Sequence, residues 1–191
     1  MFNKTENFAV IKSSPQKLRT ELDEIFKNDT DFFLETVNKK YLQKQILSIS
    51  KSKYVSDRFI IWEPVGFKSC SVFYSNFLDG WYTLLFNLAM DYKEEIFNIC
   101  LDEVENKGVM GFYYFKNGKE RIARTLYDNK WTFFERGEML PFEKKEYYKR
   151  RKIIERVNNE ILNEYLQELD VDIKNKSFYN SNASFILGSY K

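Results

Sequence analysis

The 191-residue chain contains no histidine, which is the residue type that most often carries enzyme chemistry. Without imidazole it can form neither a Ser–His–Asp nor a Cys–His catalytic group, and it has no histidine for a metal site. Its two cysteines, Cys70 and Cys100, lie in apolar, strand-like contexts that are typical of buried free thiols. Catalysis would therefore have to come from carboxylates, Lys, Tyr, Ser, Thr or Cys alone.

Carboxylates placed near lysine could support Mg²⁺-dependent nuclease chemistry. Glu105 precedes Lys107 by two residues, and Glu143 precedes Lys145 in the same way. However, Glu105 lies beside a predicted turn, and Glu143 lies at a predicted helix start, where the helix dipole favours an acid. With 28 acidic and 30 basic residues, such spacings arise by chance. We expect no catalytic residue, metal or cofactor, and keep a histidine-free Mg²⁺ enzyme as an alternative.

Basic and aromatic residues raise a second alternative, a single-stranded nucleic-acid binder. Residues 144–152 read KKEYYKRRK. The predicted sheet holds the aromatic residues Phe112, Tyr113, Tyr114, Phe115, Trp131, Phe133 and Phe134. Rings stacked on a sheet beside cations would suit single strands. The net charge of only +2 argues against a polyanionic partner. Because successive side chains of a strand point to opposite faces, about half of these rings must point into the core. Nucleic acid is therefore not the partner we expect.

The elements that would position these residues begin with a strand at 8–12 and a helix from Ser14–Pro15 to Phe26. Residues 31–50 are ambiguous: 32–34 could be a strand and 41–49 a helix, followed by a loop at 48–56. Residues 58–63 and 69–75 predict a hairpin. Asp79 is the candidate cap of an apolar helix that runs from Trp81 to about Tyr92.

The second half of the chain predicts a meander of four strands at 96–101, 109–115, 121–127 and 131–135. Asn117–Gly118 is its strongest local signal, because both central residues of a type I′ turn need positive φ. An amphipathic pattern predicts one long helix over 144–168. Residues 174–184 predict a loose loop, and Phe185–Leu187 could add an edge strand.

These elements predict one α+β domain over residues 1–191. We expect a mostly antiparallel sheet of six to seven strands with the long C-terminal helix packed on it. The sequence shows neither a secretory signal nor an apolar run long enough to span a membrane, which makes the cytoplasm the expected location.

The stretch from Gly111 to Glu143 reads GFYYFKNGKERIARTLYDNKWTFFERGEMLPFE. It resembles a hairpin module of bacterial immunity proteins from contact-dependent and polymorphic toxin systems. The matching positions are Tyr113, Gly118, Arg121, Gly137, Pro141, Phe142 and Glu143. The resemblance covers about a sixth of the chain and implies a non-enzymatic antidote that binds one cognate toxin. Nuclease antidotes of this kind are often strongly acidic, and this chain is not.

Aromatic residues make up 18% of the chain, and rings supply much of the contact area of protein interfaces. We therefore expect a protein-binding domain, most specifically an immunity protein that neutralises a cognate toxin by covering its active site. The candidate partner-binding residues are Trp81, Tyr113, Tyr114 and Arg121. For the turn Asp79–Tyr82 the alternative is structural, with Asp79 as cap and Trp81 as a core anchor.

Overall fold

The computed structural model describes residues 5–37, 57–67, 70–76, 79–102, 108–181 and 184–190. Within these ranges the chain forms one sheet of nine strands, in the order β2-β9-β3-β4-β1-β5-β6-β7-β8, and all neighbours are antiparallel. The α+β class and the antiparallel sheet are confirmed, but the prediction of six to seven strands was too low.

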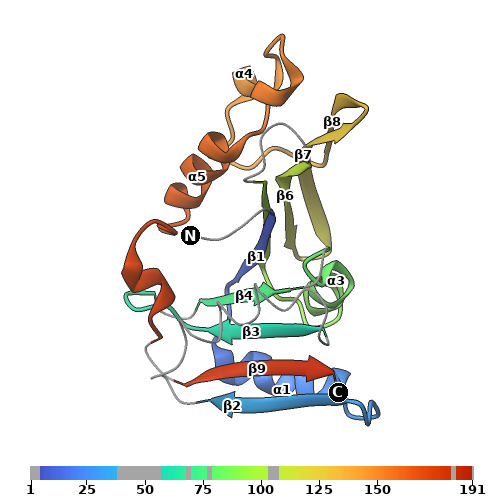
Figure 1. Cartoon of the computed structure of the whole chain (residues 1–191), viewed down its shortest axis with the longest axis vertical. Coiled ribbons are helices and arrows are strands. Elements are labelled where there is room, and N and C mark those ends of the chain that lie inside the picture. Colours follow the sequence, from blue (N-terminus) through green and yellow to red (C-terminus); the bar gives the residue numbers. More distant parts are fainter. Residues whose placement is uncertain are drawn as a thin grey trace.

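The described strands have these bounds: β1 Thr5–Ile11, β2 Phe32–Val37, β3 Arg58–Trp62, β4 Ser71–Ser75, β5 Ile96–Asp102, β6 Val109–Lys116, β7 Lys119–Asp128, β8 Lys130–Arg136 and β9 Phe185–Tyr190. The described helices are α1 Pro15–Ile25, α3 Tyr82–Met90, α4 Lys145–Tyr148 and α5 Asn159–Glu168, with 3-10 turns η2 Ile153–Glu155 and η3 Lys176–Tyr179. In Figure 1, β2, β9 and β3 lie crosswise to β1, β6 and β7, so the sheet is strongly twisted.

The hairpins predicted from the sequence are present in the sheet. β3 pairs with β4, and β5 to β8 form the predicted four-strand meander. Asn117 and Gly118 have φ values of 52° and 74°, which are the two positive angles that the turn between β6 and β7 requires. The ambiguous segment at 32–34 belongs to β2, whereas the possible helix at 41–49 and the loop at 48–56 lie outside the described residues.

The position of β9 differs from the prediction of an edge strand, because β9 lies between β2 and β3. Phe185, Ile186 and Leu187 are all buried, as an internal strand requires of both of its faces. The strands at the two edges of the described sheet are instead β2 and β8.

Helices cover both faces of the sheet, but unequally. On one face, Tyr148 of α4 stacks on Phe133 of β8, and Tyr165 of α5 meets Phe112 of β6 edge-on. Figure 1 shows α4 and α5 along one side of the meander. On the opposite face, α1 and α3 bury Leu22 and Leu85 against the central strands. There α3 reaches only one end of the meander, where Phe86 contacts Phe115.

The single helix predicted over 144–168 is wrong, because the chain breaks into α4, η2 and α5. Two arginine side chains donate hydrogen bonds to backbone carbonyl groups at the break. Arg150 Nη1 donates to Glu155 O at 2.9 Å, and Arg156 Nε donates to Arg150 O at 2.9 Å. Asn158 then starts α5, since its Oδ1 accepts a hydrogen bond from Ile161 N. The break lets Val157 become fully buried while its carbonyl binds Thr125 Oγ1.

The segment predicted as a loose loop, 174–184, includes a packed turn in its described part. Phe178 in η3 is 3% exposed, and its carbonyl accepts a hydrogen bond from Trp62 Nε1 at 2.8 Å. A buried ring and a long-range hydrogen bond anchor this turn to β3.

The start of α1 follows the prediction, with Ser14 Oγ accepting from Lys17 N and Pro15 at the first helical position. Two acidic side chains are buried beside α1: Glu21 of the helix itself is 7% exposed, and Glu94, which follows α3, is 2% exposed. Lys17 Nζ lies 2.5 Å from Glu94 Oε1 but 3.5 Å from Glu21 Oε1. Burial, together with the Glu94 carboxylate and against the attraction of Lys17, raises the pKa of Glu21 to about 7.

Glu21 therefore makes stability depend on pH. Its pKa is higher in the folded chain than its ordinary value of 4.5, so folding favours the protonated acid. The stabilisation is fully present below pH 4.5 and is lost as the pH rises through about 7. We expect the free energy of unfolding of the natural chain to fall between these pH values, relative to Glu21→Gln, by more than about 1 kcal/mol.

Urea unfolding across this pH range measures the effect. Glu24→Gln is the matched control, because Glu24 lies on the same helix with a side chain 58% exposed. Parallel pH profiles for the natural chain and Glu21→Gln would contradict the assignment.

Candidate functional site: a hollow on the uncovered face of the meander

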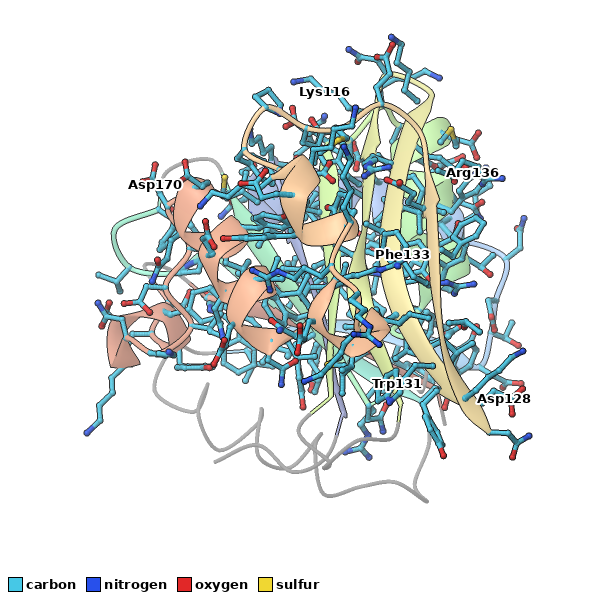
Figure 2. The ribbon with its side chains drawn as sticks, turned by 90° about the horizontal axis from the view of Figure 1, so that it is seen from above. Lys116, Asp128, Trp131, Phe133, Arg136 and Asp170 are labelled. Atoms are coloured by element: carbon cyan, nitrogen blue, oxygen red, sulfur yellow. The ribbon has the colours of Figure 1, made fainter. Side chains whose placement is uncertain are left out.

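The meander presents two rows of side chains on the face that α3 leaves largely uncovered. The strand registers place Asn98, Tyr113, Ile122 and Arg136 in one cross-strand row. The adjacent row consists of Cys100, Gly111, Arg124 and Phe134. In Figure 2, Trp131 and Phe133 lie on the side of β8 that faces the helices, and Arg136 lies on the other side.

A hollow of about 640 Å³ opens on this face. The side chains of both rows line it, together with Val109 from the start of β6 and Asn7 from β1. Asp79 and Tyr82, from the loop and first turn of α3, complete the lining at one end. Rings, amides and charged groups therefore meet in one concave surface, which is the usual composition of a binding site.

Gly111 keeps the middle of the second row free of a side chain. A Cβ atom there would lie 2.4 Å from Arg124 Cβ and 2.6 Å from the carbonyl oxygen of Ala123. Only glycine fits such a close approach of β6 to β7. The same residue thus permits the strand packing and leaves the floor of the hollow open.

Aromatic groups hold Arg124 within the hollow. Its Nη1 donates to Tyr113 Oη at 2.6 Å, and its guanidinium carbon lies 5.5 Å from the Phe134 ring centroid and 5.9 Å from that of Tyr113. Tyr82 meets Tyr113 edge-on at 5.1 Å. Burial raises the pKa of Tyr82 above its ordinary value. The arginine is therefore positioned by rings and by a hydroxyl group.

Asn98 adds a buried acceptor to the wall of the hollow. It is 4% exposed, and its Oδ1 accepts no hydrogen bond from any residue in the described part of the chain. A buried acceptor without a partner is costly, and such groups often mark functional positions.

The candidate Trp81 does not line the hollow but lies in a separate aromatic cluster. It stacks on Tyr190 with centroids 5.9 Å apart and meets Phe59 edge-on at 5.3 Å. Asp79 does not cap the helix: Trp81 is the N-cap residue, with φ of 60°, and Asp79 Oδ1 accepts a hydrogen bond from Trp81 N. The loop reaches the hollow through Asp79 and Tyr82 instead.

The two candidate tyrosines point to opposite faces of β6. Tyr113 lies in the hollow, whereas Tyr114 donates its hydroxyl hydrogen to Glu95 Oε1 at 3.0 Å. Burial and the bond to Glu95 raise the pKa of Tyr114, and Glu95 also pairs with Lys12 and Lys116. Of the four predicted residues, Tyr113 is the one that lines the hollow.

The fourth candidate, Arg121, lies in the interior at 2% exposure. Its Nε and Nη2 donate to Glu143 at 3.0 and 2.8 Å, and Nη2 also donates to Glu135 at 2.8 Å. Nη1 donates to the carbonyl of Gly137 at 3.2 Å. Glu143 accepts further hydrogen bonds from the Tyr148 hydroxyl and from Leu140 N. Arg121 thus fastens β7 to the segment that leads into α4.

This network gives a structural reason for part of the pattern that carried the resemblance. Arg121 donates hydrogen bonds to both Gly137 and Glu143, although 22 residues separate the arginine from the acid. The glycine and the terminal acid of the pattern are therefore the partners of its arginine.

Of the groups that suggested nuclease or nucleic-acid-binding chemistry, Glu143 and the basic run do not line the hollow. Glu143 is committed to Arg121, and Glu105 and Lys107 lie outside the described residues. Among the described residues, no group of three Cys, Asp or Glu could hold a metal ion. In the basic run, Lys144 pairs with Glu164 and Arg150 lies over Tyr147. The run packs on the helical face of the sheet, opposite the exposed ring of Phe134.

No helix within the described ranges is both long and apolar enough to cross a membrane.

Comparison of the chain with protein-family models, with curated proteins and with solved structures gives no match in any of the three.

Removing the acid of the buried ion pair should destabilise the fold. Glu143→Gln leaves Arg121 buried with only the half-exposed Glu135 as a charged partner. Breaking a buried pair on one side costs about 3–5 kcal/mol. We therefore expect a loss of about 3 kcal/mol in urea unfolding. Glu138→Gln is the control, since Glu138 is 90% exposed and should change stability by less than about 0.5 kcal/mol. Equal midpoints for the two variants would refute the structural role of this pair.

Proposed function

We propose that this chain is a non-enzymatic protein-binding domain that receives a segment of its partner in the hollow on β5 to β8. The observation that carries the proposal is the combination of Tyr82, Tyr113, Arg124 and Phe134 in one uncovered concavity. Tyr, Phe and Arg are enriched at the centres of protein interfaces, and Tyr and Arg are enriched among the residues that dominate binding energy.

The rigidity of the surface supports a binding role. The hollow is built on paired strands, and the Arg121–Glu143 network ties those strands to the helical segment behind them. A preformed surface loses little conformational freedom on association, and this favours affinity. Phe134 is 45% exposed on the edge strand β8, so part of an apolar ring is available to a partner.

The kind of partner is inferred from the resemblance of residues 111–143. We propose a toxin-neutralising immunity protein that acts in the cytoplasm by covering the active site of one cognate toxin. In this proposal a protruding segment of the toxin enters the hollow, and the rest of this face covers the toxin's active site. The near-neutral charge of the chain favours recognition by shape and by a few directed contacts.

Replacing the exposed ring should weaken binding. Immobilised protein is exposed to an extract of cells that express the chain and its neighbouring reading frames. We expect the natural chain to retain one protein in stoichiometric amount, and Phe134→Ser to bind it at least about tenfold more weakly, because a ring at the rim of the hollow is lost. Phe33→Ser is a matched control, since Phe33 is also 45% exposed but lies on β2, at the opposite edge of the sheet.

The retained protein must also be toxic when expressed alone and harmless when co-expressed with this chain. Retention of no protein, or equal retention by both serine variants, would overturn the proposal.

A further inference from the structure

Two arginines of β7 have opposite environments. Arg121 faces the helices and is bound by two carboxylates, Glu143 and Glu135. Arg124 faces the hollow, and its one hydrogen-bond acceptor among the described residues is the hydroxyl of Tyr113. The guanidinium of Arg124 therefore retains N–H donors that are free of any described carboxylate. A planar guanidinium binds a carboxylate through two parallel hydrogen bonds, and the neighbouring rings already restrict this one.

Asn98 supplies an independent observation that points to a ligand. Its buried Oδ1 has no partner among the described residues and lies in the wall of the same hollow. An amide oxygen accepts hydrogen bonds, so the group that completes it must be a donor. A peptide segment carries such donors along its backbone.

The charges around the hollow favour a single carboxylate over a phosphate chain. Arg136 is already paired with Glu120, and Asp79 adds a negative charge to the lining. Arg124 is thus the one lining cation that pairs with no described acid. A nucleic-acid strand is held by several cations along its backbone.

We propose that the hollow accepts an acidic side chain of the partner protein, with its carboxylate bound by Arg124 and an N–H group of the same segment donating to Asn98 Oδ1. This inference rests on the proposed function and specifies the chemistry of the partner's segment. For an occluded enzyme, it identifies the covered group as an exposed Asp or Glu.

The test uses the full chain and defined probes in an NMR titration. The probes are the capped tripeptide acetyl-Gly-Glu-Gly-amide, its Gln analogue, inorganic phosphate and adenosine monophosphate. We expect the Glu peptide to shift the Arg124 side-chain N–H and Asn98 side-chain NH₂ resonances saturably, with at least tenfold weaker binding of the Gln peptide. Arg124→Gln should abolish the shift of the Asn98 resonance. Arg124→Lys should retain part of the binding, because lysine keeps the positive charge but lacks the planar guanidinium that binds a carboxylate through two hydrogen bonds.

Arg19→Gln is the matched control, because Arg19 lies on α1 and pairs with Asp23. It should leave the titration unchanged. Stronger binding of phosphate or the nucleotide, persistence of the shifts in Arg124→Gln, or no saturable shift with the Glu peptide would each overturn the inference.

The retention experiment with immobilised protein distinguishes a failure of the acidic contact from a failure of the protein-binding function. If Arg124→Gln and Arg19→Gln retain it equally while Phe134→Ser does not, the acidic contact is wrong and protein binding stands. If no partner is retained but the Glu peptide binds through Arg124, the protein-binding proposal fails and the chemistry of the site stands.

Discussion

The buried ion pair between Arg121 and Glu143 determines which face of the meander is closed. A guanidinium at 2% exposure must have its charge compensated, and Glu143 does this from the segment that leads into α4. The pair therefore holds the helical segment on one face of β7. Tyr148 completes the contact by stacking on Phe133 and donating its hydroxyl hydrogen to Glu143.

The hollow lies on the opposite face of the meander, which the helical segment does not cover. Side chains alternate along β7, so Arg121 and Arg124, three residues apart, point in opposite directions. The first is surrounded by carboxylates, and the second by rings. Gly111 removes one side chain from the row that contains Arg124, and α3 contributes only its first residue, Tyr82, to the lining of the hollow. The result is a recess lined by Arg124 and by the buried amide oxygen of Asn98.

Local signals in the sequence predicted much of the fold. Ser14–Pro15 predicted the start of α1, and Asn117–Gly118 predicted the β6–β7 turn, because cap and turn chemistry act over a few residues. The position of β9 could not be predicted, since strand order depends on contacts between distant segments. The break after α4 was missed because Arg150 and Arg156 stabilise it with side-chain bonds that helical periodicity does not report.

The candidate site was only partly predictable. Tyr113 was identified from its ring, but alternation alone does not say which face the helices will cover. Two signals could have indicated the hollow: the polar Asn98 within the apolar run Ile96–Leu101, and the lone Gly111 within a strand pattern. Arg124 was missed because Arg121, in the same strand, carried the resemblance.

The proposed binding function requires that a partner protein contact the uncovered face of the meander. A photoreactive phenylalanine analogue at position 134, irradiated inside cells that produce the chain, tests this contact without purification. Binding at this face should give one covalent adduct of defined mass from position 134 and none from the equally exposed position 33 on β2. An adduct from position 33 alone, or none from position 134, would contradict it.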